Sequence, residues 1–108
     1  MTWPNDADGD VFRRMEKSGF DFSKAHSIDF NVDFEGWPPM TEAVALLKRR
    51  YPNAKIHEPS GKHRGYVQFQ VHALVSYELV MKIQREVSSL MADFGARCDS
   101  WGVIQDGV

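Results

Sequence analysis

Two segments of the chain alternate apolar and polar residues with a period of two, which is the pattern of a β-strand with one buried face. The segment 28–34 reads Ile-Asp-Phe-Asn-Val-Asp-Phe, and in the segment 66–74 the apolar residues Val67, Phe69 and Val71 alternate with polar ones. We therefore expect two strands whose apolar side chains face a core. Less regular patterns predict a short edge strand over 54–58 and a final strand over 96–104.

Three segments space their apolar residues as an amphipathic helix does. The first is expected from Asp8 to Ser18, with Asp8 as its N-cap, and the second from Thr41 to Arg50. The third is expected from Tyr77 to Phe94, capped by Ser76 and ended by Gly95. Its predicted core-facing stripe consists of Leu79, Ile83, Val87, Leu90 and Phe94.

The order of these elements predicts the fold class. Without the first helix the order is β-α-β-β-α-β, the split βαβ pattern of a ferredoxin-like sandwich. We expect an α+β domain with an antiparallel sheet, its first and third strands adjacent at the centre. One-sided strands indicate helices on one face of that sheet. The extra N-terminal helix is added to this core, and residues 1–108 are expected to form a single domain.

The composition of the chain indicates which class of protein it belongs to and where in the cell we expect it. A content of 43% hydrophobic and 26% charged residues is ordinary for a globular protein, and no apolar run has the length of a membrane span. We expect no secretion signal at the N-terminus, and Cys98 has no second cysteine to form a disulfide with, so we expect a cytoplasmic protein. The formal net charge of −2 gives no general attraction to nucleic acid.

The polar sides of the two alternating strands form the main candidate site. If the strands pair, seven polar residues share one uncovered face, which could dock a basic protein partner. These residues are Asp29, Asn31, Asp33, Tyr66, Gln68, Gln70 and His72. Two alternatives remain open: the face is simply solvated, or the N-terminal helix covers it.

Direct RNA binding is an alternative function for the same face. The segment 64–69 resembles the RNP1 strand of RNA-recognition motifs, whose aromatic residues stack on bases. Only Tyr66 supplies such an aromatic residue, and Asp29 stands where the first strand would need another. A small-ligand-binding domain is a further alternative. The basic hairpin tip at Lys62, His63 and Arg64 could contact an acidic partner or be a soluble turn.

No residue spacing supports catalysis, a metal site or a cofactor. The cluster Asp6, Asp8 and Asp10 lacks the glycine and glutamate of a calcium-binding loop, so helix capping explains it better. The four histidines show no paired ligand spacing. His26 is expected to be satisfied by hydrogen bonds, and Cys98 to be a small core residue. We therefore expect a non-enzymatic protein.

The last predicted strand carries Cys98-Asp99-Ser100-Trp101-Gly102-Val103 after a helix that ends in Phe94-Gly95. With the Asp-rich start and the segment Ser18-Gly19-Phe20-Asp21, this resembles the family of regulators of ribonuclease E activity, type B (RraB). The resemblance covers roughly residues 4 to 105. It implies a ferredoxin-like domain that binds ribonuclease E and restrains RNA decay without cutting RNA.

The closing motif of the family is matched at three positions, namely Asp99, Trp101 and Gly102. Ser100 stands in place of the family's glycine, and Cys98 in place of its tyrosine. The strongly acidic tails of well-known members are not found here, where Asp106 is the only acidic residue after the last predicted strand. The motif itself has an architectural alternative, because a tryptophan in a final strand commonly packs in a core.

Overall fold

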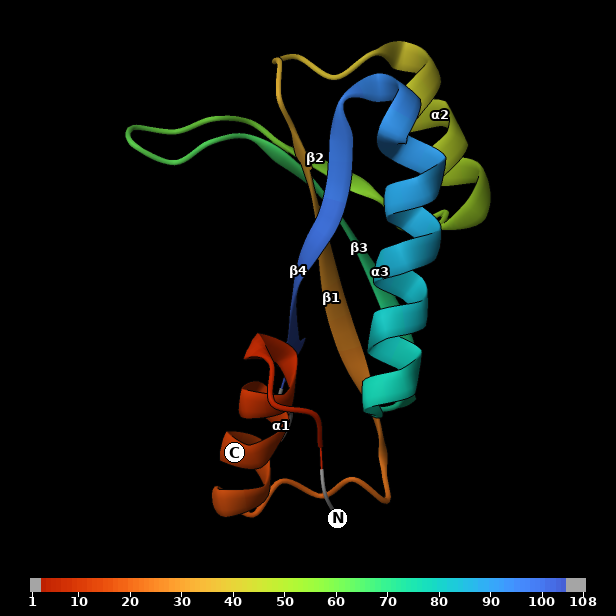
Figure 1. The fold of residues 1–108 in the computed structure, drawn as a ribbon. Coiled ribbons are helices and arrows are strands. Elements are labelled where there is room, and N and C mark those ends of the chain that lie inside the picture. Colours follow the sequence, from red (N-terminus) through yellow and green to blue (C-terminus); the bar gives the residue numbers. More distant parts are fainter. Residues whose placement is uncertain (1–2, 105–108) are drawn as a thin grey trace.

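The computed structural model describes residues 3–104 and contains the expected succession of helices and strands (Figure 1). The elements are α1 (Ala7–Lys17), β1 (Ala25–Phe34), α2 (Thr41–Arg50), β2 (Lys55–His57), β3 (Tyr66–Leu74), α3 (Tyr77–Met91), a 3₁₀ turn η1 (Ala92–Phe94) and β4 (Ala96–Ile104). The predicted bounds of α2, β3 and β4 agree with the structure, whereas β1 begins three residues before the alternating segment. Within residues 3–104, no helix is long and apolar enough to cross a membrane.

The four strands form one open antiparallel sheet in the order β2-β3-β1-β4. The prediction that the first and third strands lie side by side at the centre is confirmed, as is the α+β class. Agreement with a regular ferredoxin-like sandwich is partial. β2 is only three residues long, and the chain from β2 to β3 continues beyond the sheet as a projecting hairpin (Figure 1). Its tip turns at Gly61, whose φ of 57° is readily adopted by glycine.

The apolar sides of the central strands form the core of the domain. Ile28, Phe30 and Val32 of β1 have no exposed surface, and neither have Val67 and Phe69 of β3. The rings of Phe30 and Phe69 stack across the two strands with centroids 5.3 Å apart. Such cross-strand pairs stabilise a sheet, and here they also fix which side of β1 faces the helices.

Helix α3 covers this apolar side, with both expected terminal signals in place. The Ser76 hydroxyl accepts a hydrogen bond from the Leu79 amide at 3.1 Å, and Gly95 adopts a φ of 66° after the closing 3₁₀ turn. The predicted stripe faces the core, but the α-helix ends at Met91 rather than Phe94, and the most deeply buried positions lie to one side of the stripe. The buried residues of α3 are Val80, Ile83, Gln84, Val87 and Met91, while Leu79, Leu90 and Phe94 are half-buried.

Helix α1 packs at one end of the molecule, beside the start of α3 (Figure 1). The predicted cap at Asp8 is wrong. The cap is Asp6, whose Oδ1 accepts from the Gly9 amide at 2.6 Å. Asp8 instead accepts a hydrogen bond from Trp101 Nε1 at 2.8 Å, and the ring centroids of Phe12 and Trp101 lie 5.2 Å apart. The helix is therefore attached to β4 by both a polar and an aromatic contact.

The outer edge of β4 is protected by a hydroxyl group from α3. The Cys98 amide donates to Ser88 Oγ at 2.9 Å, and that hydroxyl donates to the Cys98 carbonyl oxygen at 3.2 Å. Unpaired edge groups of a sheet are a template for unwanted strand pairing. One serine thus satisfies both backbone groups of an edge residue. Cys98 itself is 2% exposed, which confirms it as a core residue, and burial raises the pKa of its thiol to about 12.

We expect Ser88→Ala to lower the free energy of unfolding by about 1–3 kcal/mol, because it leaves the Cys98 amide and carbonyl without a partner. Urea denaturation followed by circular dichroism measures this loss. The matched control is Ser89→Ala, which removes an exposed hydroxyl from the next position of the same helix. Equal stability of the two variants would show that water replaces the Ser88 hydroxyl at no cost.

Candidate protein-binding face

The polar sides of β1 and β3 meet on the side of the sheet away from the helices. The register pairs Asp29 with Gln70, Asn31 with Gln68, Asp33 with Tyr66 and Ser27 with His72. All seven predicted site residues therefore lie together, and each is exposed or half-buried. We call them the open sheet face. α1 packs against α3 and Trp101 rather than over this face. The role of the open sheet face in binding a partner stays a prediction.

A ladder of side-chain hydrogen bonds crosses three strands of the open sheet face. Gln70 Nε2 donates to Asp29 Oδ1 at 2.7 Å, and Gln68 Nε2 donates to Asn31 Oδ1 at 3.0 Å. Asn31 Nδ2 in turn donates to the Ser100 hydroxyl of β4 at 3.1 Å. Gln68 orients Asn31, which orients Ser100, and Gln70 separately holds Asp29, so the side chains in the middle of the face are tied to their neighbours by hydrogen bonds.

Asp33 stands at the end of this ladder and has different surroundings. Partial burial raises the pKa of its carboxyl group, and the nearby carboxylate of Asp99 raises it further through charge repulsion and a shared hydrogen bond. The guanidinium groups of Arg64 and Arg97 act in the opposite direction but do not cancel these effects. The carboxyl group of Asp33 therefore loses its proton less readily than an ordinary aspartate does.

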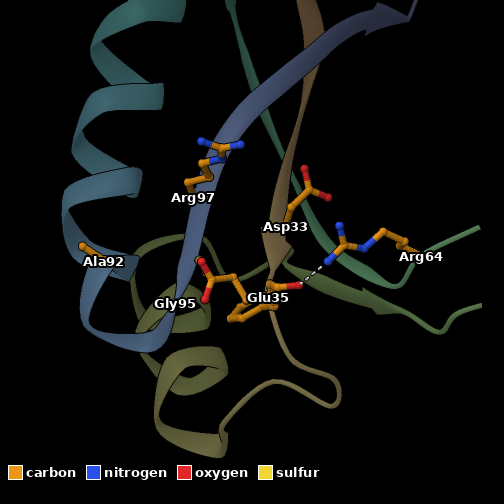
Figure 2. Close-up of a pocket in the computed structure, with 8 residues that line it drawn as sticks. Asp33, Glu35, Arg64, Ala92, Gly95 and Arg97 are labelled. Atoms are coloured by element: carbon orange, nitrogen blue, oxygen red, sulfur yellow. Dashed lines mark hydrogen bonds between the residues drawn. The ribbon is translucent and has the colours of Figure 1, made fainter.

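A polar cleft of about 480 Å³ adjoins Asp33 where β1 ends and β4 begins (Figure 2). Arg64 enters from the base of the hairpin, and its Nη2 donates to the Phe34 carbonyl oxygen at 3.1 Å. Arg97 Nε lies 3.0 Å from Asp99 Oδ2. Figure 2 shows acidic and basic side chains interleaved around the opening, with Glu35 near Gly95. The face is therefore less uniformly acidic than the β1 sequence indicated.

The structure adds residues to this face that the sequence did not reveal. His57 of β2 stacks on Tyr66, with ring centroids 4.7 Å apart and planes 10° from parallel. Its Nε2 is buried, with no hydrogen-bond partner among the described residues. On β4, Arg97 pairs with Asp33 and Ser100 with Asn31. The alternation of the sequence could not predict that Arg97 and Ser100 lie on this face. The reason is that the pairing of β4 with β1 shifts by one residue between Asn31 and Val32.

That register shift involves the family motif. Asp99 is the extra residue of the bulge, and bulges re-aim side chains within a strand. Trp101 lies on the helix side of the sheet, opposite Phe30, and is held by Asp8 and Phe12. Its observed contacts are therefore architectural. Gly102 lies opposite Asp29, where an added Cβ would meet no atom within 4 Å.

The acidic N-terminal cluster and His26 have structural partners. Asp6 caps α1 and also accepts from the Tyr77 hydroxyl at 2.6 Å, while Asp10 forms an ion pair with Arg13. His26 Nε2 lies 3.1 Å from the Asp21 carbonyl oxygen, which confirms the expected hydrogen bond. Across residues 3–104, no group of three or more His, Cys, Asp or Glu side chains is arranged to hold a metal ion.

The fold and the face together define a small α+β domain with a preorganised polar sheet surface. Comparison with protein families identifies it more closely. The family model described as regulator of ribonuclease activity B, RraB, matches residues 5–103. The chain belongs to this family, which confirms the resemblance found in the sequence. The family description names regulation of a ribonuclease as the role of its members. A search of curated proteins finds no match.

The raised pKa of Asp33 predicts a pH-dependent contribution to stability. Because the folded pKa exceeds the unfolded one, this contribution is fully present below the ordinary aspartate pKa. It is lost as the pH rises through the folded value. We therefore expect Asp33→Asn to stabilise the fold at pH 7, by less than about 1 kcal/mol because solvent screens the group. Urea denaturation at pH 7 and pH 3.5 should show the gain only at pH 7.

A second substitution tests the cause of this shift. We expect Asp99→Asn to lower the pKa of Asp33, because it removes the neighbouring negative charge, whereas Arg97→Gln should raise it. Carbon-detected NMR titration of the Asp33 carboxyl group measures both changes. An Asp33 pKa that is the same in all three proteins would contradict the proposed electrostatic origin.

Proposed function

We propose that this protein binds ribonuclease E and lowers its cleavage of RNA, without cleaving RNA itself, and that the open sheet face makes the contact. The family description supports regulation of a ribonuclease. The observation that carries the choice of surface is the exposed carboxylate of Asp33, which stands on the same side of the sheet as the hydrogen-bonded side chains of Asp29, Asn31, Gln68 and Gln70. The role implies a cytoplasmic location, which suits a protein with one unpaired thiol.

The chemistry of the face favours a partner segment with Lys or Arg side chains. Asp29 already accepts from Gln70 but keeps further lone pairs, and Asp33 is exposed, with Tyr66 opposite it on β3 and Arg97 opposite it on β4. Charge-assisted hydrogen bonds to these carboxylates would be stronger than bonds between neutral groups. Such contacts would speed association and select the partner more than they would raise affinity.

Direct RNA binding by the same face is less favourable. One side of the Tyr66 ring is taken by His57, and Asp33 is the residue paired with Tyr66 on β1. A base stacking on this tyrosine would bring its phosphate close to a carboxylate, which repels it. We therefore propose inhibition through contact with the nuclease rather than by shielding the RNA.

A cleavage assay tests this proposal. We expect the purified protein to slow the cleavage of a fluorescent RNA by ribonuclease E while binding that RNA poorly by itself. The double variant Asp29→Asn with Asp33→Asn should inhibit about 5-fold less well. The loss of two solvent-exposed charge pairs, each worth about 0.5 kcal/mol, gives this factor. Inhibition should also weaken as the salt concentration rises.

The matched control removes the same charge elsewhere. The double variant Glu16→Gln with Asp93→Asn neutralises two exposed carboxylates outside the open sheet face and should inhibit as the unmodified protein does. Equal losses in both double variants would point to net charge rather than to this face. Absence of any effect of the unmodified protein on cleavage would overturn the proposed function itself.

A further inference from the structure

The charged side chains that line the polar cleft beside Asp33 are balanced in number. Asp33 and Glu35 supply two carboxylates to its lining, and Arg64 and Arg97 supply two guanidinium groups (Figure 2). Asp99 stands beside the cleft, where it pairs with Arg97 and raises the pKa of Asp33 by charge repulsion. A basic group of a partner must therefore compete with the protein's own cations for these carboxylates.

The two guanidinium groups are held in different ways. Arg64 Nη2 donates to the Phe34 carbonyl oxygen at 3.1 Å in partly buried surroundings, and so ties the base of the hairpin to the end of β1. Arg97 contacts Asp99 through Nε at 3.0 Å, and its side chain is 76% exposed. Exposed ion pairs are weak, because water competes for both groups and ordering the side chains costs entropy. Arg97 can therefore leave its carboxylate at little cost, whereas Arg64 cannot leave without loosening the hairpin.

The bulge in β4 brings the competing groups together. Arg97 lies opposite Asp33 in the pairing of β4 with β1, and Asp99 is the extra residue of the bulge two positions further on. The charge of Arg97 lowers the pKa of Asp33, which the neighbouring Asp99 raises. Arg97 thus pairs with one of these carboxylates and acts on the other. The ion pair also shows that a guanidinium group fits at Asp99.

We propose that Arg97 is a built-in competitor, which occupies the place at Asp99 that a basic side chain of the protein partner takes on binding. This inference rests on the proposed function, because it specifies how the open sheet face receives a basic segment. Asp99 is paired before and after the exchange, so only the difference between two ion pairs contributes to affinity. Arg97 therefore weakens the binding of every basic partner and favours segments with a further cation that reaches Asp29.

The variant Arg97→Gln tests this role, because it removes the charge and keeps a polar side chain at an exposed position. We expect it to inhibit the cleavage of a fluorescent RNA by ribonuclease E about 2- to 3-fold more strongly than the unmodified protein does at low salt. This is the factor expected when one exposed ion pair no longer has to be replaced. Arg97→Lys keeps the charge and should inhibit as the unmodified protein does.

A double-mutant cycle separates the local contact from the net charge. In the Asp99→Asn protein, most of the gain from Arg97→Gln should disappear, because the carboxylate over which the two cations compete is gone. The matched control is Arg14→Gln, which removes the same charge from an exposed position of α1 and should inhibit as the unmodified protein does. Equal gains from Arg97→Gln and Arg14→Gln, or a full gain without Asp99, would overturn the competition.

A titration with fluorescein-labelled hexa-arginine, followed by anisotropy, measures the exchange without the nuclease. We expect Arg97→Gln to bind this peptide about 2- to 3-fold more tightly than the unmodified protein does. If the unmodified protein does not slow cleavage, the proposed function is wrong, and the peptide titration still decides the role of Arg97. If the Asp29 and Asp33 double variant loses peptide binding while Arg97→Gln gains none, the open sheet face binds basic segments and the competition by Arg97 is wrong.

Discussion

The structure depends on β1, which pairs on both edges and is apolar on only one side. Its alternation puts Ile28, Phe30 and Val32 into the core and turns Asp29, Asn31 and Asp33 outward. A slip of one residue along the regular pairing of β1 with β3 would place apolar and polar side chains on the same side of the sheet, with carboxylates against α3 or apolar residues in solvent. The cost of that exchange fixes β3 beside β1. The same constraint that builds the core therefore also creates the open sheet face.

The N-terminal helix shows how an acidic segment can be structural. Asp6 accepts hydrogen bonds from the Gly9 amide of α1 and from the Tyr77 hydroxyl, and Asp8 accepts one from the indole nitrogen of Trp101. These contacts join α1 to α3 and to β4, which are distant in the sequence. Trp101, part of the family motif, is therefore linked to the acidic start of the chain through packing and a hydrogen bond. A motif with these contacts is maintained by the fold, whatever surface the protein uses for binding.

Much of the fold followed from the sequence because its strongest signals are local. The alternation of β1 and β3, the Ser76 cap and the Gly95 stop each reflect short-range physics. The errors have non-local causes. Asp6 rather than Asp8 caps α1 because the helix begins at Ala7, which leaves Asp8 in its first turn and in contact with Trp101, and the most buried side of α3 is set by where the sheet lies beneath it.

The residues of the candidate site likewise fall into those that the sequence predicted and those that it could not predict. The seven residues on β1 and β3 follow from alternation once the strands pair. Arg97, Ser100 and the bulge at Asp99 do not, because a bulge shifts the register without leaving a clear mark in the sequence. The stack of His57 on Tyr66 is equally non-local, since it depends on how the short edge strand aligns.

The open sheet face also has an internal order of interaction strength. Asp29 already accepts a hydrogen bond from Gln70, so a partner would form fewer new hydrogen bonds with Asp29 than with Asp33. A cation placed between Asp33 and Asp99 would relieve their repulsion and lower the pKa of Asp33. Linkage is reciprocal, so protonation of Asp33 would weaken the binding of that cation by the same factor. The part of the raised Asp33 pKa that comes from Asp99, which is smaller than the part from burial, therefore reflects the same local charge balance as the affinity for a basic partner.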